Sequence, residues 1–245
     1  MDNQHFEVRL AETEADIRAT QRLRFEVFVE EMGANSSPLD RADRLERDRF
    51  DPYFDHLLLL YKSKVVGAYR LMRSDMAAKG IGFYSAREFS LDKLKNHAAL
   101  ELGRSCVDKA FRGGVGMHLL WDGLGQYVVK HDLKILFGVA SFPGADPAPL
   151  KPALTYLHHK YLAPNDLRVR STSYLSLDQM AWEAVDQRAA LKVIPPLMRA
   201  YLRLGGFVGD GAYIDQAFNT VDVCLIMDTD RMVRRYKDFY GRERS

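Results

Sequence analysis

The 245-residue sequence predicts one α/β domain built around a central sheet. Three observations support this fold class. Apolar runs of strand length alternate with segments of helical apolar spacing, which is typical of a mixed sheet covered by helices on both faces. Hydrophobic residues make up 47% of the chain, enough for a sizeable core. No repeat, low-complexity linker or shift in composition marks a boundary. We expect a single domain over 1–245, whose N-terminal half, 1–145, carries the candidate site and whose C-terminal half, 146–245, completes the sheet.

The beginning of the chain predicts a strand, a helix and a β-hairpin. Phe6, Val8 and Leu10 alternate with polar residues, as in a half-buried strand. Apolar spacing predicts a helix over 13–32 with Thr13 as its N-cap. The charged stretch 35–55 is expected to be an ordered loop with one helical turn. Two apolar runs, HLLLLYK and KVVGAYRLM, meet at 62–64 and predict the hairpin.

The rest of the chain alternates between the two element types. We expect strands at ALELGRSCV, LKILFGVAS, LRVRSTSY and VDVCLIMD. We expect helices at 85–96, 114–131, 150–162 and 195–204.

Composition narrows the function classes. A net charge of +2 does not indicate a nucleic-acid partner. Cys106 and Cys224 give neither a disulfide framework nor metal spacing, and are expected to be reduced core residues of a cytoplasmic protein. The first residues lack the features of a signal peptide, and no uncharged run approaches the ~18 residues of a membrane span. Contact with the surface of the inner membrane stays open. His118 and Asp122 have no third ligand, so we expect no metal site.

Charged side chains interrupt two of the apolar patterns. At ~100° per residue, Arg24 lies in the middle of the apolar side of the first helix, next to Phe28. Arg70 interrupts the second strand of the hairpin in the same way. A buried, unpaired guanidinium is very costly. Arg24 must therefore meet a loop carboxylate or line a cavity that takes an anion, and both interpretations stay open.

Most acidic residues of the stretch 35–55 are expected to be solvated. Asp48 and Asp51 differ, because Phe50, Tyr53 and Phe54 are interleaved with them and should anchor this part of the loop. Anchored carboxylates beside aromatic rings are suited to hold a cationic substrate or to brace the arginines.

The segment LELGRSCVDKAFRGG contains further candidates. On a regular strand Glu101 and Arg104 would point to opposite faces. A β-bulge near Gly103 would bring them to one side, and bulges are frequent beside active sites. Gly113, Gly114 and Gly116 precede a helical pattern, an arrangement that suits phosphate binding but also an ordinary tight turn. Neither a dinucleotide fingerprint nor a P-loop is present.

The order of hairpin, strand, glycine turn, helix and strand resembles the core of the Gcn5-related N-acyltransferases. In that family the turn holds the pyrophosphate of coenzyme A or the phosphate of a carrier-protein arm. The usual motif is Gln/Arg-x-x-Gly-x-Gly. Here FRGGVG retains Gly114 and Gly116, but Phe111 occupies the basic position and Arg112 follows one residue late. This departure weakens the case for coenzyme A itself.

A closer resemblance covers nearly the whole chain. RLRFEVFVEEMGA, DRFDPYFDHLLL, LELGRSCV, HLLWDGLGQYV, LHHKYLAP and YLRLGGFVGDGAYID together resemble the ornithine–acyl-carrier-protein N-acyltransferases, which make the lyso form of ornithine lipid in bacteria. The related acyl-homoserine lactone synthases share a subset of positions: Arg24, Phe28, Asp48, Asp51, Arg70, Glu101 and Arg104. Those synthases also carry a tryptophan shortly after the first helix. Residues 32–38, MGANSSP, contain none, which favours the lipid enzyme.

The resemblance implies an N-acyltransferase that moves a 3-hydroxyacyl group from acyl carrier protein to the α-amine of L-ornithine or a similar amino acid such as glutamine. No permanently bound cofactor is expected, because the donor is the 4′-phosphopantetheine arm of the carrier protein. The catalytic candidates are Glu101, as general base, and Arg104. The substrate-binding candidates are Arg24, Phe28, Asp48, Asp51 and Arg70. The candidates for holding the phosphopantetheine are Arg112, Gly113, Gly114 and Gly116. The alternatives are a lactone-forming signal synthase and a non-catalytic module that docks acyl carrier protein or a membrane.

Overall fold

The computed structural model describes residues 5–112 and 115–232, which group into two compact units. The first unit comprises Met1–Gly82 and Glu101–Asp132, and the second comprises Phe83–Leu100 and Leu133–Ser245. Each unit therefore draws on two segments of the chain, and we describe each by itself. That the chain works as a single domain stays a prediction.

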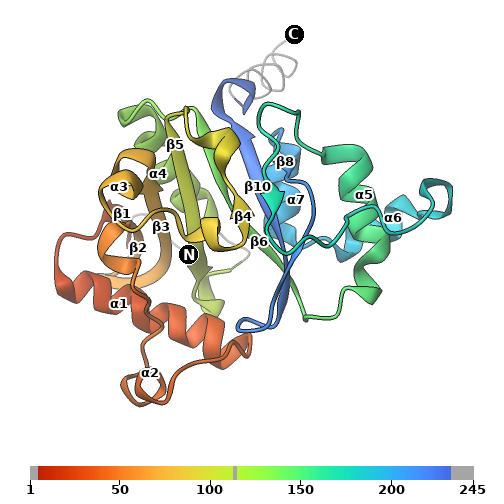
Figure 1. The fold of residues 1–245 in the computed structure, drawn as a ribbon. Helices are drawn as coiled ribbons and strands as arrows, with labels where there is room; N and C mark the ends of the chain where they lie inside the picture. Colours follow the sequence, from red (N-terminus) through yellow and green to blue (C-terminus); the bar gives the residue numbers. More distant parts are fainter. Residues whose placement is uncertain (1–4, 113–114, 233–245) are drawn as a thin grey trace, which may run out of the picture. The chain divides into compact units, whose positions relative to one another are not determined.

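Four strands lie side by side in the first unit (Figure 1), in the order β1 (Phe6–Leu10), β2 (Asp55–Tyr61), β3 (Lys64–Arg73) and β5 (Ala99–Val107). β2 pairs antiparallel with both β1 and β3. The β2–β3 turn is formed by Lys62 and Ser63, whose φ angles are 48° and 65°. Two residues with positive φ are the mark of a tight hairpin turn. The predicted hairpin is confirmed.

Two helices cover opposite faces of these strands. α1 (Glu14–Arg24) begins at the predicted N-cap, Thr13, which forms a capping box with Asp16. Ala68 of β3 packs against residues of this helical region. A Cβ added to the preceding residue, Gly67, would lie 3.0 Å from Leu120 of α4 (Gly116–Lys130). Because successive strand residues point to opposite faces, α1 and α4 lie on opposite sides, as the predicted α/β class requires.

The predicted first helix changes character after Arg24. It continues as a π-helix, Phe25–Glu31, a conformation that is rare and is often found at functional sites. The stretch 35–55, expected to be a loop with one helical turn, contains the short helix α2 (Pro38–Asp43) and a 3₁₀ turn at Asp51–Tyr53. The sequence analysis did not specify the short helix α3 (Ser74–Lys79).

A glycine sets how closely α4 packs on the strands. A Cβ at Gly123 would lie 2.5 Å from Val8 Cγ1 and 3.5 Å from Leu57. We expect Gly123→Ala to lower the free energy of unfolding by about 1–3 kcal/mol, because the extra carbon forces the packing apart. Gly125→Ala is the matched control, since nothing lies within 4 Å of its added carbon. There helix propensity should raise stability by about 0.5–1 kcal/mol. Urea unfolding curves test the pair, and equal effects would contradict the packing argument.

The second unit is built on a long antiparallel pair, β6 (Ile135–Pro143) and β10 (Thr220–Asp228). β8 (Phe207–Val208) and β9 (Tyr213–Asp215) also pair with β10. A separate two-stranded sheet joins β4 (Phe89–Ser90) to β7 (Arg170–Ser171). The helices are α5 (Lys151–Tyr161), α6 (Gln187–Val193) and α7 (Pro196–Arg203). Phe89, Phe137 and Ile226 belong to one buried core cluster of this unit.

Two predicted elements are wrong. The helix expected over 85–96 is instead two 3₁₀ turns, Tyr84–Arg87 and Asp92–Leu94, with β4 between them. Phe89 is completely buried in the core cluster and pairs with β7, so tertiary packing overrides the local helical spacing. The strand expected at LRVRSTSY is reduced to Arg170–Ser171, the part that β4 pairs with.

Two further predictions concern the cysteines and membrane-spanning helices. Cys106 and Cys224 are both buried and free, as expected for core thiols. Among the residues described, no helix combines the length and hydrophobicity needed to cross a membrane.

Candidate active site

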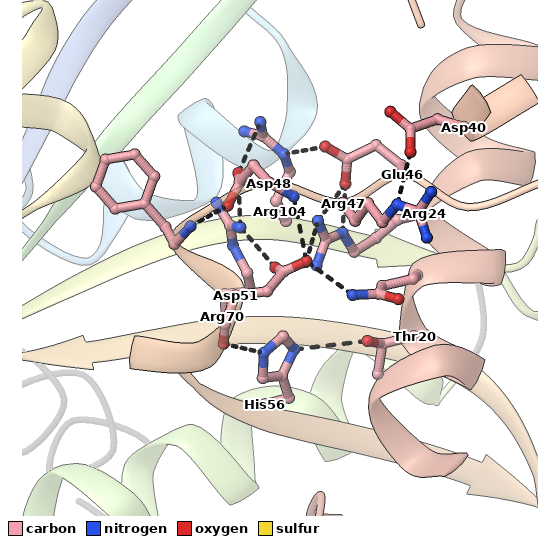
Figure 2. A network of polar contacts seen from close by, with 12 residues as sticks. Thr20, Arg24, Asp40, Glu46, Arg47, Asp48, Asp51, His56, Arg70 and Arg104 are labelled. Carbon is pink, nitrogen blue, oxygen red and sulfur yellow. Dashed lines mark hydrogen bonds and ion pairs between the residues drawn. The ribbon is translucent and has the colours of Figure 1, made fainter. Parts of the chain in front are cut away.

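An ion-pair network of three arginines and three carboxylates forms one polar centre in the first unit (Figure 2). The arginines come from three elements: Arg24 ends α1, Arg70 lies in β3 and Arg104 lies in β5. The carboxylates come from one loop and the 3₁₀ turn that follows it: Glu46, Asp48 and Asp51. Sequence reasoning singled out five of these six residues.

Arg24 and Arg70 are almost inaccessible to solvent, with side-chain exposures of 0% and 1%. Arg24 pairs with Glu46 and, through Nη1, with Asp51 Oδ1 at 2.7 Å. Arg70 Nη1 donates to Asp48 Oδ2 and to Asp51 Oδ1, both at 2.8 Å. The guanidinium of Arg70 also lies over the ring of Phe54, 4.4 Å from its centre. Of the two interpretations left open for Arg24, the structure therefore shows the loop carboxylates as its partners.

Arg104 has a left-handed backbone, with φ of 52° in the middle of a strand. This conformation is uncommon for a residue with a side chain and costs of order 1–3 kcal/mol. β5 is therefore irregular one residue after Gly103, and that this irregularity is the expected β-bulge stays a prediction. In this conformation Arg104 Nε donates to Glu46 Oε1 at 3.1 Å, while Nη2 lies 3.7 Å from Asp48 Oδ2.

Glu101 is 2% exposed and lies on the same strand. A Cβ added to Gly103 would lie 4.0 Å from Arg70 Nε. Because residues two apart on a strand share a face, Glu101 points to the side on which Arg70 lies. The structure thus brings a buried carboxylate to the face of β5 that meets the network.

The charges within the network stabilise one another's ionised forms. Burial by itself raises the pKa of Glu46, but the positive charges of Arg104 and Arg24 outweigh it and lower the pKa to about 2. Burial likewise raises the pKa of Asp51, and the charges of Arg24 and Arg70 hold it well below its usual range. For Arg24, burial lowers the pKa, while Glu46 and Asp51 raise it overall. All three groups stay charged at neutral pH.

A second layer of polar residues holds Asp51 in place. Gln21 Nε2 donates to Asp51 Oδ2 at 3.0 Å. His56 is 2% exposed, and its Nε2 lies 3.1 Å from the carbonyl oxygen of Asp51. Its other ring nitrogen, Nδ1, lies 3.5 Å from Thr20 Oγ1. A proton on Nε2 lets this nitrogen donate to the carbonyl, as a neutral imidazole can. The hydroxyl of Thr20 itself donates to the carbonyl of Ile17 at 2.8 Å.

His56 should make the protein less stable in mild acid. Burial lowers its pKa from 6.5, so below that pH the unfolded chain binds a proton that the folded chain resists. Stability should be fully present above pH 6.5 and fall at lower pH, by at most about 1.4 kcal/mol per pH unit for one group. Unfolding curves between pH 7.5 and 5 test this. In His56→Gln the loss of stability that comes from protonation of His56 should disappear. In His131→Gln, which changes a more exposed histidine, most of the loss of stability at low pH should remain. An unchanged decline in His56→Gln would contradict the assignment.

The other predicted residues are placed as follows. Phe28 lies in the π-helix and packs, partly buried, against Leu23, Val27, Ala68 and Cys106. Arg112 is exposed, pairs with Glu31 and donates from Nε to the carbonyl of Val107 at 2.8 Å. Gly116 begins α4, where a Cβ would lie 3.1 Å from Leu59 Cδ2, so close packing also accounts for this glycine. Gly113 and Gly114 lie outside the described residues.

Sequence reasoning missed Glu46, His56 and Gln21. Glu46 was grouped with the acids expected to be solvated, yet it is 9% exposed and joins Arg24 to Arg104. A count of charges offers a signal that a third acid takes part, because three carboxylates would neutralise three arginines in apolar settings, but it does not say which acid. Asp48 and Asp51 supply only two. No comparable signal marks His56 or Gln21.

Comparisons with known proteins show the family to which the chain belongs. Residues 23–122 match the family model of an acetyltransferase (GNAT) domain. The chain is 50% identical to an L-ornithine N(alpha)-acyltransferase of Rhodobacter capsulatus, over 97% of this chain and 95% of that protein. It is 44% identical to the protein of the same name in Brucella abortus, over 97% and 89%.

Among solved structures, FeeM, an N-acyl amino acid synthase from uncultured soil microbes, gives a TM-score of 0.54 at 9% identity, covering 94% of both chains. MesI, a CoA-dependent acyl-homoserine lactone synthase, gives 0.50 at 14% identity, covering 96% of this chain and 95% of that one. Similarity at these identities shows a shared fold. The family follows from the sequence identity, which extends over nearly the full length of both proteins: this chain belongs to the L-ornithine N(alpha)-acyltransferases and is an acyltransferase enzyme.

Proposed function

We propose that the protein transfers a 3-hydroxyacyl group from acyl carrier protein to the α-amine of L-ornithine, which yields a lyso-aminolipid. The observation that carries this proposal is the 50% identity, over almost the whole chain, to a relative named L-ornithine N(alpha)-acyltransferase. The buried carboxylate and arginines on β3 and β5 are the chemical groups that this reaction would use.

The reaction joins an amine to a thioester. The nitrogen lone pair attacks the carbonyl carbon, the ammonium proton is lost, and the C–S bond breaks to release the carrier-protein thiol. An α-amino group has a pKa of about 8 in peptides, so deprotonation alone supplies one to a few orders of magnitude. Glu101, directly or through a water molecule, is the proposed base, in line with the ~10²–10⁴-fold effect of such groups. Holding amine and thioester together is the larger contribution, up to about 7–11 kcal/mol.

We use solvent exposure to divide the network into residues that hold the site in shape and residues that bind the amino acid. Arg24, Arg70 and Asp51 have side chains at most 5% exposed, and their contacts to one another suit a rigid support. Asp48 and Arg104 are the more accessible members, at 20% and 13%. We assign Asp48 to an ammonium group of ornithine and Arg104 to its α-carboxylate. The donor's phosphopantetheine phosphate is assigned to the turn that holds Arg112, Gly113, Gly114 and Gly116.

One assay tests the reaction. Purified protein is given 3-hydroxyacyl carrier protein and, separately, L-ornithine, L-glutamine, L-lysine or S-adenosylmethionine, and the product is identified by mass spectrometry. We expect an amide on the α-nitrogen of ornithine and release of one thiol per amide. Formation of a homoserine lactone from S-adenosylmethionine, or no transfer to any amino acid, would overturn the proposal.

The salt dependence of the reaction tests whether acyl carrier protein is the donor. Acyl carrier proteins are acidic, and the exposed cations Lys109, Arg112 and Lys130 would attract one over a Debye length of ~8 Å at physiological salt. We expect the Michaelis constant for the carrier-protein substrate to rise with salt, and charge reversal at Lys130 to mimic that rise with little change in turnover. The same acyl group on free phosphopantetheine is the control and should respond weakly. Equal efficiency with acyl-coenzyme A would refute the donor assignment.

A further inference from the structure

A second group of acidic side chains lies in the second unit, and none of its members belongs to the network described above. Glu88, Asp215 and Asp222 each place one carboxylate oxygen within 4.8 Å of the others. Glu88 and Asp222 are 4% and 2% exposed, and Asp215 is half-buried. These residues come from the segment before β4, from β9 and from β10, and Figure 1 labels β4 and β10.

Hydrogen bonds fix the carboxylate of Asp215 and the main chain of Glu88. Asp215 Oδ1 accepts from the amides of Ala217 and Phe218 at 2.7 and 3.0 Å, which fixes it at the turn between β9 and β10. The carbonyl of Glu88 accepts from both the amide and the hydroxyl of Thr172, at 2.8 and 3.0 Å. The acidic side chains of the cluster therefore come from segments whose positions are fixed by hydrogen bonds.

A buried hydroxyl provides an independent observation. Thr220 is 8% exposed, and its Oγ1 makes no hydrogen bond to any residue that the structure describes. Thr220 pairs directly with Asp215 across the β9–β10 ladder and lies two residues before Asp222 on β10. Cross-strand partners and residues two apart on a strand share a face. The hydroxyl therefore points to the same side as the two aspartates, and a buried hydroxyl without a partner is costly.

The chemistry of these four side chains is that of a hard cation site. Carboxylates this close repel one another unless a proton or a cation lies between them. Calcium binds six to eight oxygen ligands at 2.3–2.6 Å, so one ion can bridge oxygens up to about 4.8 Å apart. Carboxylate and hydroxyl oxygens, with no sulfur or imidazole present, favour magnesium, calcium or manganese over zinc or copper.

We propose that Glu88, Asp215, Asp222 and Thr220 bind one hard divalent cation, which joins the segment before β4 to the β9–β10 hairpin. This departs from the expectation of no metal site. The reason is that Glu88 lies more than 120 residues before the other three ligands in the chain, and the four have no recognisable spacing. The proposal is independent of the acyl-transfer reaction, because it predicts binding and stabilisation of the folded protein without substrates.

Manganese is the probe for the first experiment. The full-length protein, stripped with a chelator, is titrated with MnCl₂ while free Mn²⁺ is followed by electron paramagnetic resonance, and CaCl₂ and MgCl₂ are then added as competitors. We expect one saturable site, competition by at least one of the two ions, and a melting temperature that rises with cation concentration. No saturable binding up to millimolar Mn²⁺ would overturn the proposal.

Three variants locate the site. Asp222→Asn removes a charged ligand and should weaken Mn²⁺ binding at least about tenfold, since ligand charge sets affinity in such sites. Thr220→Val keeps the shape, removes only the hydroxyl, and should weaken binding less. Asp166→Asn, at an exposed acid of the same unit, should change nothing. If Asp222→Asn is more stable than the wild type and Mn²⁺ stabilises neither protein, the carboxylates share a proton and the proposal is wrong.

Discussion

Asp51→Asn should lower the free energy of unfolding by about 3–5 kcal/mol, the cost typical of breaking a buried ion pair from one side. Asp51 Oδ1 accepts from both Arg24 and Arg70, at 2.7 and 2.8 Å. Asparagine has almost the same shape but no charge, and both guanidiniums lose a counter-ion in a region from which water is excluded. Urea unfolding at pH 7.5 measures the change.

The matched control for this variant is Asp43→Asn. Asp43 accepts from Arg47 at 2.8 Å, a similar distance, but both side chains are more than 30% exposed. Exposed pairs contribute about 0–1 kcal/mol. The two aspartates therefore separate the effect of burial from the effect of pairing. A loss below 1 kcal/mol in Asp51→Asn would mean that the network is hydrated in solution and does not support the fold.

Glu101→Gln should reduce turnover by about 10²–10⁴ at neutral pH, because glutamine cannot accept the proton that the attacking amine loses. Glu101 is the buried carboxylate on the face of β5 that meets Arg70, and the substitution preserves its size. The melting temperature should change little. The Michaelis constants should change much less than turnover, since the lost interaction belongs to the transition state.

The control makes the same chemical change elsewhere in this unit. Glu26→Gln replaces an exposed glutamate of the π-helix and should leave turnover within about twofold of the wild type. A pH profile provides a second readout, because loss of a general base removes the acid limb of the rate profile. Turnover of Glu101→Gln within threefold of the wild type would remove Glu101 from the role of base.

Local patterns predicted those elements whose causes are local. The alternation of Phe6, Val8 and Leu10 predicts β1, and Thr13 caps α1 as expected. The same periodicity placed Arg24 on a buried face, and its side chain is indeed fully buried. These features depend on contacts within a few residues, on the period of a helix or strand, and on the cost of burying polar groups, all of which are properties of the sequence itself.

Only the tertiary structure decided which charges meet. The Arg24–Glu46 and Arg104–Glu46 contacts join residues 22 and 58 positions apart, and nothing in the loop sequence ranks Glu46 above its acidic neighbours. The local sequence does not predict the left-handed backbone of Arg104 either, because this conformation ordinarily favours glycine and the sequence has arginine there. Ion pairs with Glu46 and Asp48 hold that conformation, and such pairs exist only after the strands and the loop have folded together.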